Sequence, residues 1–146
     1  MFTEAHIHPM FVHFPIALGM TGYLFYCIYF FFKKESKCYE FFSFFTLLFA
    51  SIAAVCTVIT GSYFTFDLSG EAGQLKNIHS SFASAATTCF CIGSGIQILS
   101  WLIKKNLNQY RWIVFTVYTA AFILIMITGF YGGSIVYDHL LIPGLK

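Results

Sequence analysis

Four long apolar stretches constrain the fold of this chain of 146 residues more than any other feature. They cover residues 11–32, 41–64, 78–103 and 112–136. About 20 helical residues cross the hydrocarbon core of a bilayer, so each stretch is long enough to span it. Strands are excluded because each stretch far exceeds a strand's usual length and lipid accepts strands only in closed barrels of alternating polarity. We therefore predict an all-α integral membrane protein, a four-helix bundle in a single domain.

The composition agrees with a membrane protein. Charged residues make up 10% of the chain, whereas a soluble domain contains about 25%. The first ten residues contain no Lys or Arg, so we expect the first stretch to be a permanent span and not a cleaved signal peptide. The net charge of +2 is too small to indicate a nucleic-acid partner, and membrane lipid is the expected surrounding.

The basic residues predict the orientation of the spans. Six of the eight Lys and Arg residues lie in the first and third connections. By the positive-inside rule these connections face the cytoplasm. Both termini and residues 65–77 are then predicted to face the periplasm, as in a multi-pass protein of a bacterial inner membrane. The six residues are Lys33, Lys34, Lys37, Lys104, Lys105 and Arg111.

Histidines gather at the predicted periplasmic ends of the spans. Four of the five, His8, His13, His79 and His139, lie there, and His6 is expected to be solvent-exposed. Imidazoles near lipid are costly unless they are coordinated or hydrogen-bonded. Neutral imidazole is a common ligand of haem iron, copper and zinc. We therefore predict that these four histidines bind a cofactor or metal, and the absence of a Cys-x-x-Cys-His motif argues against covalent c-type haem.

The two halves of the chain resemble each other around these histidines. His13 precedes Thr60 by 47 residues, and His79 precedes Thr128 by 49. Each threonine is followed by glycine. Either an internal duplication or a shared helix-packing composition explains the likeness. A parallel duplication has its pseudo-two-fold axis along the membrane normal.

The duplication predicts how the histidines pair. His13 is expected to face His79 as one axial pair, with His8 and His139 as a second pair at the outer rim. Pro15 leaves the start of the first helix open, because a helix through it is kinked and a helix beginning near it leaves His13 outside. Small residues are expected to let helices or a flat macrocycle approach closely; they are Gly19, Gly22, Gly93, Gly95, Gly129 and Gly133. Asn77 is expected to cap the third helix.

Two segments resemble the signature of a known family. HPMFVHFPIAL at residues 8–18 and GGSIVYDH at residues 132–139 are similar to segments of a bacterial four-span membrane family, domain of unknown function 2231. The resemblance covers essentially the whole chain and implies a four-helix membrane fold whose motif histidines are His8, His13 and His139, and by position His79. The family is similar in outline to two-haem b-type membrane cytochromes. Leu140 replaces the usual glycine after the last motif histidine.

The predicted function follows from these histidines. We expect one or two b haems near the periplasmic face, exchanging electrons between a membrane quinol and a periplasmic redox protein. A transmembrane electron path is not expected, because no histidine lies in the cytoplasmic half. The alternatives are a copper or zinc site built from the same histidines and a non-catalytic accessory subunit. No catalytic residue set is assigned, whether the protein is an enzyme stays open, and a homo-oligomer is one expected assembly.

Overall fold

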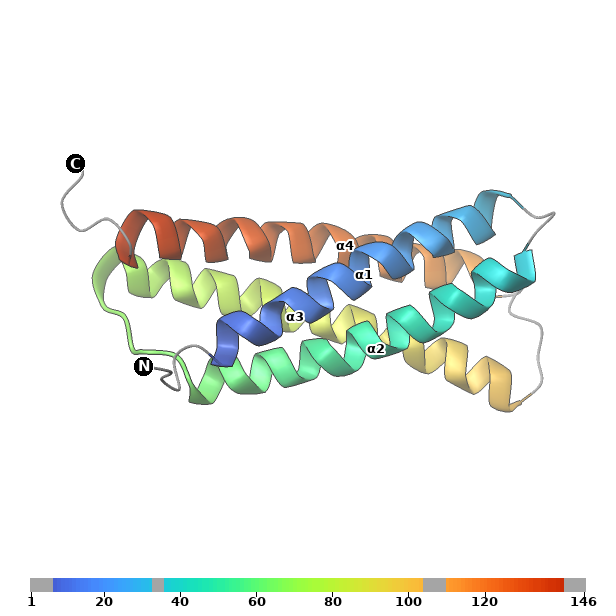
Figure 1. Ribbon diagram of the computed structural model, residues 1–146, viewed down its shortest axis with the longest axis horizontal. Coiled ribbons are helices and arrows are strands. Elements are labelled where there is room, and N and C mark those ends of the chain that lie inside the picture. Colours follow the sequence, from blue (N-terminus) through green and yellow to red (C-terminus); the bar gives the residue numbers. More distant parts are fainter. Residues whose placement is uncertain (1–6, 33–35, 104–109, 141–146) are drawn as a thin grey trace.

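The computed structural model describes residues 7–32, 36–103 and 110–140, and for Ser36, His139 and Leu140 it describes the backbone alone. Within these ranges the chain forms four long helices, one π-helical turn and no strand (Figure 1). Each helix is long and apolar enough to cross a membrane, which confirms the predicted all-α bundle. The elements are α1 (Ile7–Phe31), α2 (Ser36–Tyr63), α3 (Gly70–Leu102), α4 (Arg111–Ser134) and the π-helical turn η4 (Ile135–Leu140), which continues α4.

The first three helices include their predicted apolar stretches to within one residue, and α4 together with η4 includes the fourth, but α3 begins eight residues before its predicted start. Its N-cap is Ser69, and Gly70 has a positive φ of 64°, a conformation in which glycine carries no steric penalty. Asn77 therefore lies inside α3, and its predicted role as the cap is wrong. The first turns of α3 are polar, so hydropathy alone does not reveal them.

Helix α1 runs continuously through Pro15, which settles the question of where it begins. Proline has no backbone N–H, so the Phe11 carbonyl four residues earlier loses its usual helical donor. The hydroxyl Oγ1 of Thr57, on α2, lies 3.2 Å from this carbonyl oxygen and 2.8 Å from the Ala53 carbonyl oxygen of its own helix. Because α1 begins at Ile7, both His8 and His13 lie on one helix.

The bundle consists of two hairpins. The most extensive packing is within α1–α2 and within α3–α4, while α2–α3 and α1–α4 close the ring of four helices. Figure 1 shows that the start of α1, the end of α4 and the α2–α3 connection lie at one end of the bundle, and that the end of α1 and the start of α4 lie at the opposite end. We call the first of these ends the terminal end and the second the loop end.

Three glycines allow close helix contacts. A Cβ atom on Gly22 of α1 would lie 2.7 Å from Leu47 of α2, and one on Gly93 of α3 would lie 2.6 Å from the Tyr118 ring of α4. Gly19 of α1 has the same relation to Phe90 of α3, at 2.8 Å. No helix packs closely against three others, which have open space where a side chain would extend, and the approach of a flat macrocycle to them stays a prediction: Gly95, Gly129 and Gly133.

A chain of buried polar groups joins the two hairpins in the core. Ser51 Oγ lies 2.8 Å from Ser94 Oγ, which lies 3.1 Å from the Tyr118 hydroxyl. That hydroxyl donates to Gln97 Oε1 at 2.7 Å. Water cannot satisfy polar groups in a bilayer core, so these groups must satisfy one another. The network therefore fixes the position of one hairpin against the other.

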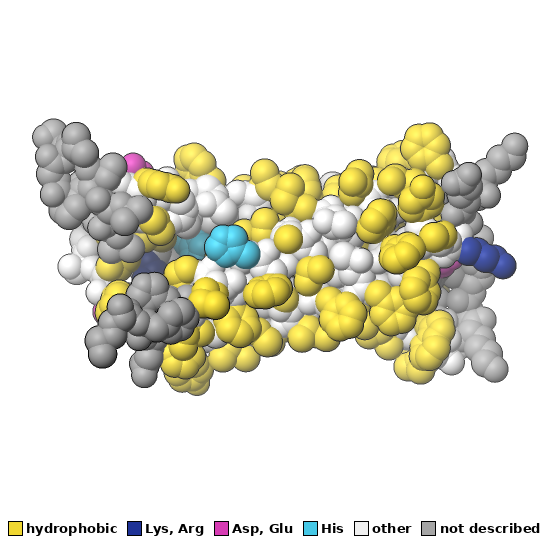
Figure 2. All heavy atoms as spheres, in the orientation of Figure 1, with side chains coloured by type: hydrophobic (Ala, Val, Ile, Leu, Met, Phe, Trp, Pro, Cys, Tyr) yellow, Lys and Arg dark blue, Asp and Glu magenta, His cyan; other side chains and the backbone are white. Residues whose placement is uncertain are grey.

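The chemistry of the surface changes along the long axis of the bundle. Figure 2 shows apolar side chains over most of the length of one face and charged ones toward its ends. At the loop end, Trp101 and Trp112 are exposed, and at the terminal end so are Tyr63 and Tyr137. Aromatic residues of this kind are enriched at both membrane–water interfaces. The guanidinium of Arg111 stands 4.4 Å from the Phe30 ring centroid, which places a cation at the loop end.

Candidate functional site

Two histidines from different hairpins meet at the terminal end. His8 is the second residue of α1 and His79 is the tenth residue of α3. Their ring centroids are 6.5 Å apart, and their planes are inclined at 89°, an edge-to-face arrangement. We call these two residues the imidazole pair. Figure 2 shows histidine side chains on one face, in the half of the bundle nearer its terminal end and beside apolar side chains.

Each ring of the pair is held through Nδ1 by its own hairpin. His79 Nδ1 lies 3.0 Å from the Thr128 carbonyl oxygen of α4. A carbonyl only accepts, so Nδ1 carries the proton and Nε2 keeps a lone pair. His8 Nδ1 lies 3.4 Å from Thr60 Oγ1 of α2. That hydroxyl donates to the Thr57 carbonyl at 3.0 Å, which leaves its oxygen to accept from His8.

A glycine lies beside each ring. A Cβ atom on Gly61 would come within 2.9 Å of His8 Cε1, and one on Gly132 within 3.1 Å of His79 Cε1. Contacts this short are tighter than van der Waals packing allows. Glycine is therefore the residue that lets α2 and α4 approach the two imidazoles without displacing them.

The two hairpins build equivalent halves of the site. His8 lies 23 residues before the last residue of α1, and His79 lies 23 residues before the last residue of α3. Each contacts a threonine near the far end of its partner helix, 52 and 49 residues along the chain. The predicted likeness of the halves therefore has a structural counterpart. The correspondence differs from the predicted one, because His8 and not His13 is the counterpart of His79.

His13 lies elsewhere on α1. Five residues of helix turn it about 140° away from His8. Its side chain is exposed, and its Nδ1 lies 2.7 Å from the Pro9 carbonyl oxygen of the same helix. The predicted facing of His13 and His79 is thus absent from the structure. The backbone of His139 belongs to η4 at the terminal end; its side chain and all of His6 lie outside the described residues.

The helix lengths place the pair at the edge of a bilayer. Twenty-three residues of helix from the loop end correspond to about 35 Å at a rise of about 1.5 Å per residue. The hydrocarbon core is about 30 Å thick. If the loop end marks one boundary, the imidazole pair lies at the opposite boundary, where both water and lipid approach it.

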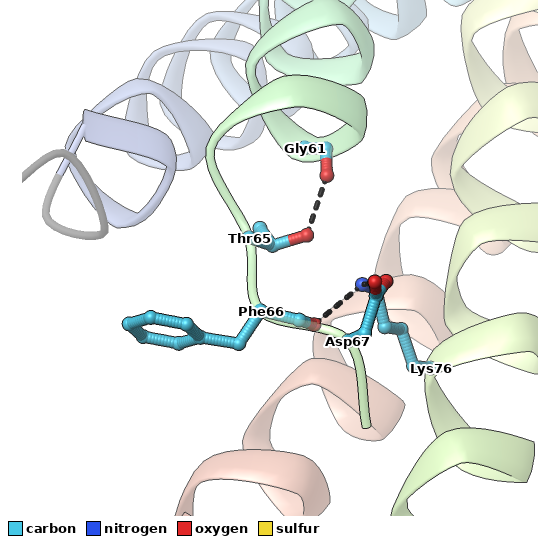
Figure 3. Close-up of polar contacts among 5 residues, drawn as sticks. All are labelled: Gly61, Thr65, Phe66, Asp67 and Lys76. Atoms are coloured by element: carbon cyan, nitrogen blue, oxygen red, sulfur yellow. Dashed lines mark hydrogen bonds and ion pairs between the residues drawn. The ribbon is translucent and has the colours of Figure 1, made fainter. Parts of the chain in front are cut away.

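The connection between the hairpins is clamped next to the site (Figure 3). Thr65 Oγ1 donates to the Gly61 carbonyl at 2.6 Å, and Lys76 Nζ donates to the Phe66 carbonyl at 2.6 Å. Lys76 Nζ also lies 3.8 Å from Asp67 Oδ1, although an exposed ion pair contributes little stability. These bonds tie the end of α2 to the start of α3, so they hold the two halves of the imidazole pair in register.

The two threonine–glycine pairs at residues 60–61 and 128–129 were found from the sequence, but their contacts with histidines were not predicted. Gly132 and Lys76 were also missed. The equal distance of His8 and His79 from the far ends of their helices was the signal for the correct pairing. That signal was hidden because the beginnings and ends of the helices could not be read from hydropathy.

Two imidazoles with Nε2 lone pairs can serve as ligands of one metal centre. No group of three or more His, Cys, Asp or Glu side chains that could hold a metal ion occurs within residues 7–32, 37–103 and 110–138. The site therefore offers two nitrogen ligands from the described part of the chain.

The sequence matches a known protein family. The model of a family described as predicted membrane protein (DUF2231) matches residues 4–142. No curated protein and no solved structure matches the sequence.

Proposed function

For this chain, which belongs to the DUF2231 family of predicted membrane proteins, we propose binding of b-type haem for electron transfer near one membrane face. The proposal is drawn from the geometry of the chain's own site. His8 and His79 are the residues that would hold the haem iron. The imidazole pair carries this proposal, since each hairpin supplies one ring with an anchored Nδ1 and a free Nε2 lone pair. Haem, when bound, supplies one-electron chemistry, and the protein tunes it through its axial ligands and burial.

The number of ligands supports haem over a bare metal ion. A porphyrin provides four nitrogen ligands in its plane, so the protein has to add two. Structural zinc sites take four protein ligands and catalytic ones take three. The described residues bring together two imidazoles and no third ligand, which favours one haem over a copper or zinc site.

The arrangement of the pair sets one requirement for this proposal. The ring centroids are 6.5 Å apart and the planes are inclined at 89°, so both rings would have to turn Nε2 toward one iron atom to hold it together. Gly129 and Gly133 leave the surface of α4 bare beside the residue that holds His79, so a flat macrocycle meets little side-chain obstruction there.

The position of the site suggests its partners. The pair lies at the membrane boundary opposite the basic loop end, which by the positive-inside rule is the periplasmic side of a bacterial inner membrane. A site in this position would be accessible both to a quinol dissolved in the bilayer and to a periplasmic redox protein.

An absorption spectrum of the purified protein in detergent, before and after dithionite, tests the proposal. We expect a Soret band that shifts on reduction and sharp α and β bands, because iron with two imidazole ligands is low-spin. A pyridine haemochrome assay should give one b haem per chain. His8→Ala and His79→Ala should each abolish the low-spin spectrum, whereas His13→Ala should retain it.

The other outcomes point to the alternatives. A colourless protein that carries stoichiometric copper or zinc would indicate metal handling. A colourless protein free of metal would indicate an accessory subunit. A full low-spin spectrum in His8→Ala and in His79→Ala would show that the imidazole pair does not hold the haem.

A further inference from the structure

Lys76 lies next to the imidazole pair, on the side nearer the terminal end. It precedes His79 by three residues on α3. Residues three apart on a helix are neighbours on its surface, and the rise between them is about 4.5 Å. Since α3 begins at the terminal end, this step leads from His79 toward that end. The charge of Lys76 is also close enough to His8 to act on it electrostatically, so one cation is near both halves of the pair.

The ammonium group of Lys76 has unused hydrogen-bond donors. Its Nζ donates to the Phe66 carbonyl at 2.6 Å, and Asp67 Oδ1, at 3.8 Å, is beyond hydrogen-bond distance. An ammonium has three N–H donors, so two of them form no hydrogen bond within the part of the chain that the structure describes. The Asp67 side chain is fully exposed, and its attraction to Lys76 is weak because water screens it. Another carboxylate can therefore replace Asp67 at small cost.

Burial distinguishes Lys76 from the other charged residues at the terminal end. The acidic residues there, Asp67, Glu71 and Asp138, are exposed, whereas the Lys76 side chain is only 29% exposed. Among residues 7–32, 36–103 and 110–140, no other Lys or Arg lies at this end. Water and salt screen a partly buried charge less than an exposed one. An anionic group beside the imidazole pair would therefore meet the charge of Lys76 with the least screening.

The proposed haem would bring such a group to this place. Haem b carries two carboxylate side chains on one edge of an otherwise apolar macrocycle. Charged groups are costly inside a bilayer. A haem held by the imidazole pair at the membrane boundary would therefore turn its carboxylate edge toward the water at the terminal end, and Lys76 lies on that side of His79.

We propose that Lys76 binds a carboxylate group of the haem in place of Asp67 and thereby orients the macrocycle, with its carboxylate edge toward the terminal end. This inference rests on the proposed haem function. Lys76 forms no bond to the iron, so its removal changes the affinity for haem and leaves the coordination by the two histidines intact. A charge-assisted hydrogen bond to a carboxylate is stronger than a neutral one, which makes the effect measurable.

Titration of the apoprotein in detergent, followed by the Soret band, compares haem with haem dimethyl ester, whose carboxylates are blocked and uncharged. Lys76→Met should weaken the binding of haem about tenfold, the worth of one hydrogen bond to a charged group. The same variant should bind the dimethyl ester within about twofold of the wild type. At saturating haem its spectrum should stay low-spin, because both histidines remain. Lys76→Arg keeps the charge and should bind haem within about threefold of the wild type.

Lys37→Met is the matched control, because Lys37 is exposed in the first turn of α2 at the loop end. It should bind both ligands like the wild type. Asp67→Asn removes the competing carboxylate and should bind haem at least as tightly as the wild type.

Two results would overturn the role of Lys76 alone. One is haem affinity of Lys76→Met equal to that of the wild type. The other is an equal loss of affinity for haem and for the dimethyl ester, because Lys76 would then act only through its bond to the Phe66 carbonyl. A wild type that binds neither ligand would instead refute the proposed haem function, and the role of Lys76 with it.

Discussion

At the scale of single residues, the three histidines whose side chains are described share one chemical feature. Each places Nδ1 next to an oxygen atom of the protein: His8 near a threonine hydroxyl, and His13 and His79 near carbonyls. Hydrogen bonds of this kind fix the tautomer and orientation of an imidazole that acts as a ligand. The same feature therefore occurs both in the imidazole pair and at the exposed ring of His13.

Replacing the glycine beside a ligand should disturb the site selectively. Gly132→Ala puts a Cβ atom 3.1 Å from His79 Cε1, so the ring has to shift by a few tenths of an ångström. We expect haem affinity to fall by about tenfold, the lower end of the loss seen when the support of a ligand is removed. Titration of the apoprotein with haem, followed by the Soret band, measures this.

Gly95→Ala is the matched control, because its Cβ atom also meets open space and Gly95 lies nearer the loop end of α3, away from the imidazole pair. Both variants replace a glycine inside a long helix by a better helix former, so their effects on helix propensity cancel. Equal haem affinities of the two variants would contradict the placement of His79 against α4.

At the scale of elements, the sequence predicts more of the fold than of the candidate site. The four apolar stretches are long enough to be identified individually, and the hairpin order follows from their short connections. The helix ends could not be predicted, because α3 continues for eight residues beyond the apolar stretch and polar residues in a helix outside the lipid leave no hydropathy signal. The pairing of the histidines depends on those ends.

The start of α1 is the second point at which the structure goes beyond the sequence, and the reason is the proline inside this helix. A proline inside a helix is tolerated in membranes where a neighbouring side chain satisfies the freed carbonyl. Thr57 lies in position to do so for Phe11. From the sequence alone, this partner 46 residues away was invisible, and Pro15 was as consistent with a helix start as with a helix interior.

Removing that partner should weaken the first hairpin. Thr57→Val keeps the shape of the side chain and leaves the Phe11 carbonyl without a donor. We expect the free energy of unfolding to fall by about 1 kcal/mol, as for a typical intramolecular hydrogen bond. Unfolding in mixed micelles with increasing dodecyl sulfate measures this value.

Thr116→Val provides the comparison for that experiment. Thr116 is exposed, and its hydroxyl bonds only to the Trp112 carbonyl of its own helix, so its loss should change stability by less than about 0.5 kcal/mol. If both variants unfold alike, the contact between Thr57 and α1 does not stabilise the hairpin.

At the scale of the whole molecule, the two ends of the bundle differ in chemistry. The imidazole pair and the clamp at Lys76 lie toward the terminal end, and Arg111 and the two tryptophans lie at the loop end. A bundle with such different ends has to insert in one orientation to function. Under the proposed function, the orientation decides whether the partners of the site would be periplasmic or cytoplasmic.

Thiol labelling of intact cells should determine this orientation. Ser69→Cys introduces a thiol at an exposed position of the α2–α3 connection, and native Cys38 is exposed near the loop end. Because the basic connections are expected to be cytoplasmic, a membrane-impermeant maleimide should label the introduced cysteine in intact cells. Cys38 should react only after the cells are lysed. Labelling of Cys38 alone in intact cells would invert the topology, place the imidazole pair on the cytoplasmic side and make a cytoplasmic reductant its donor.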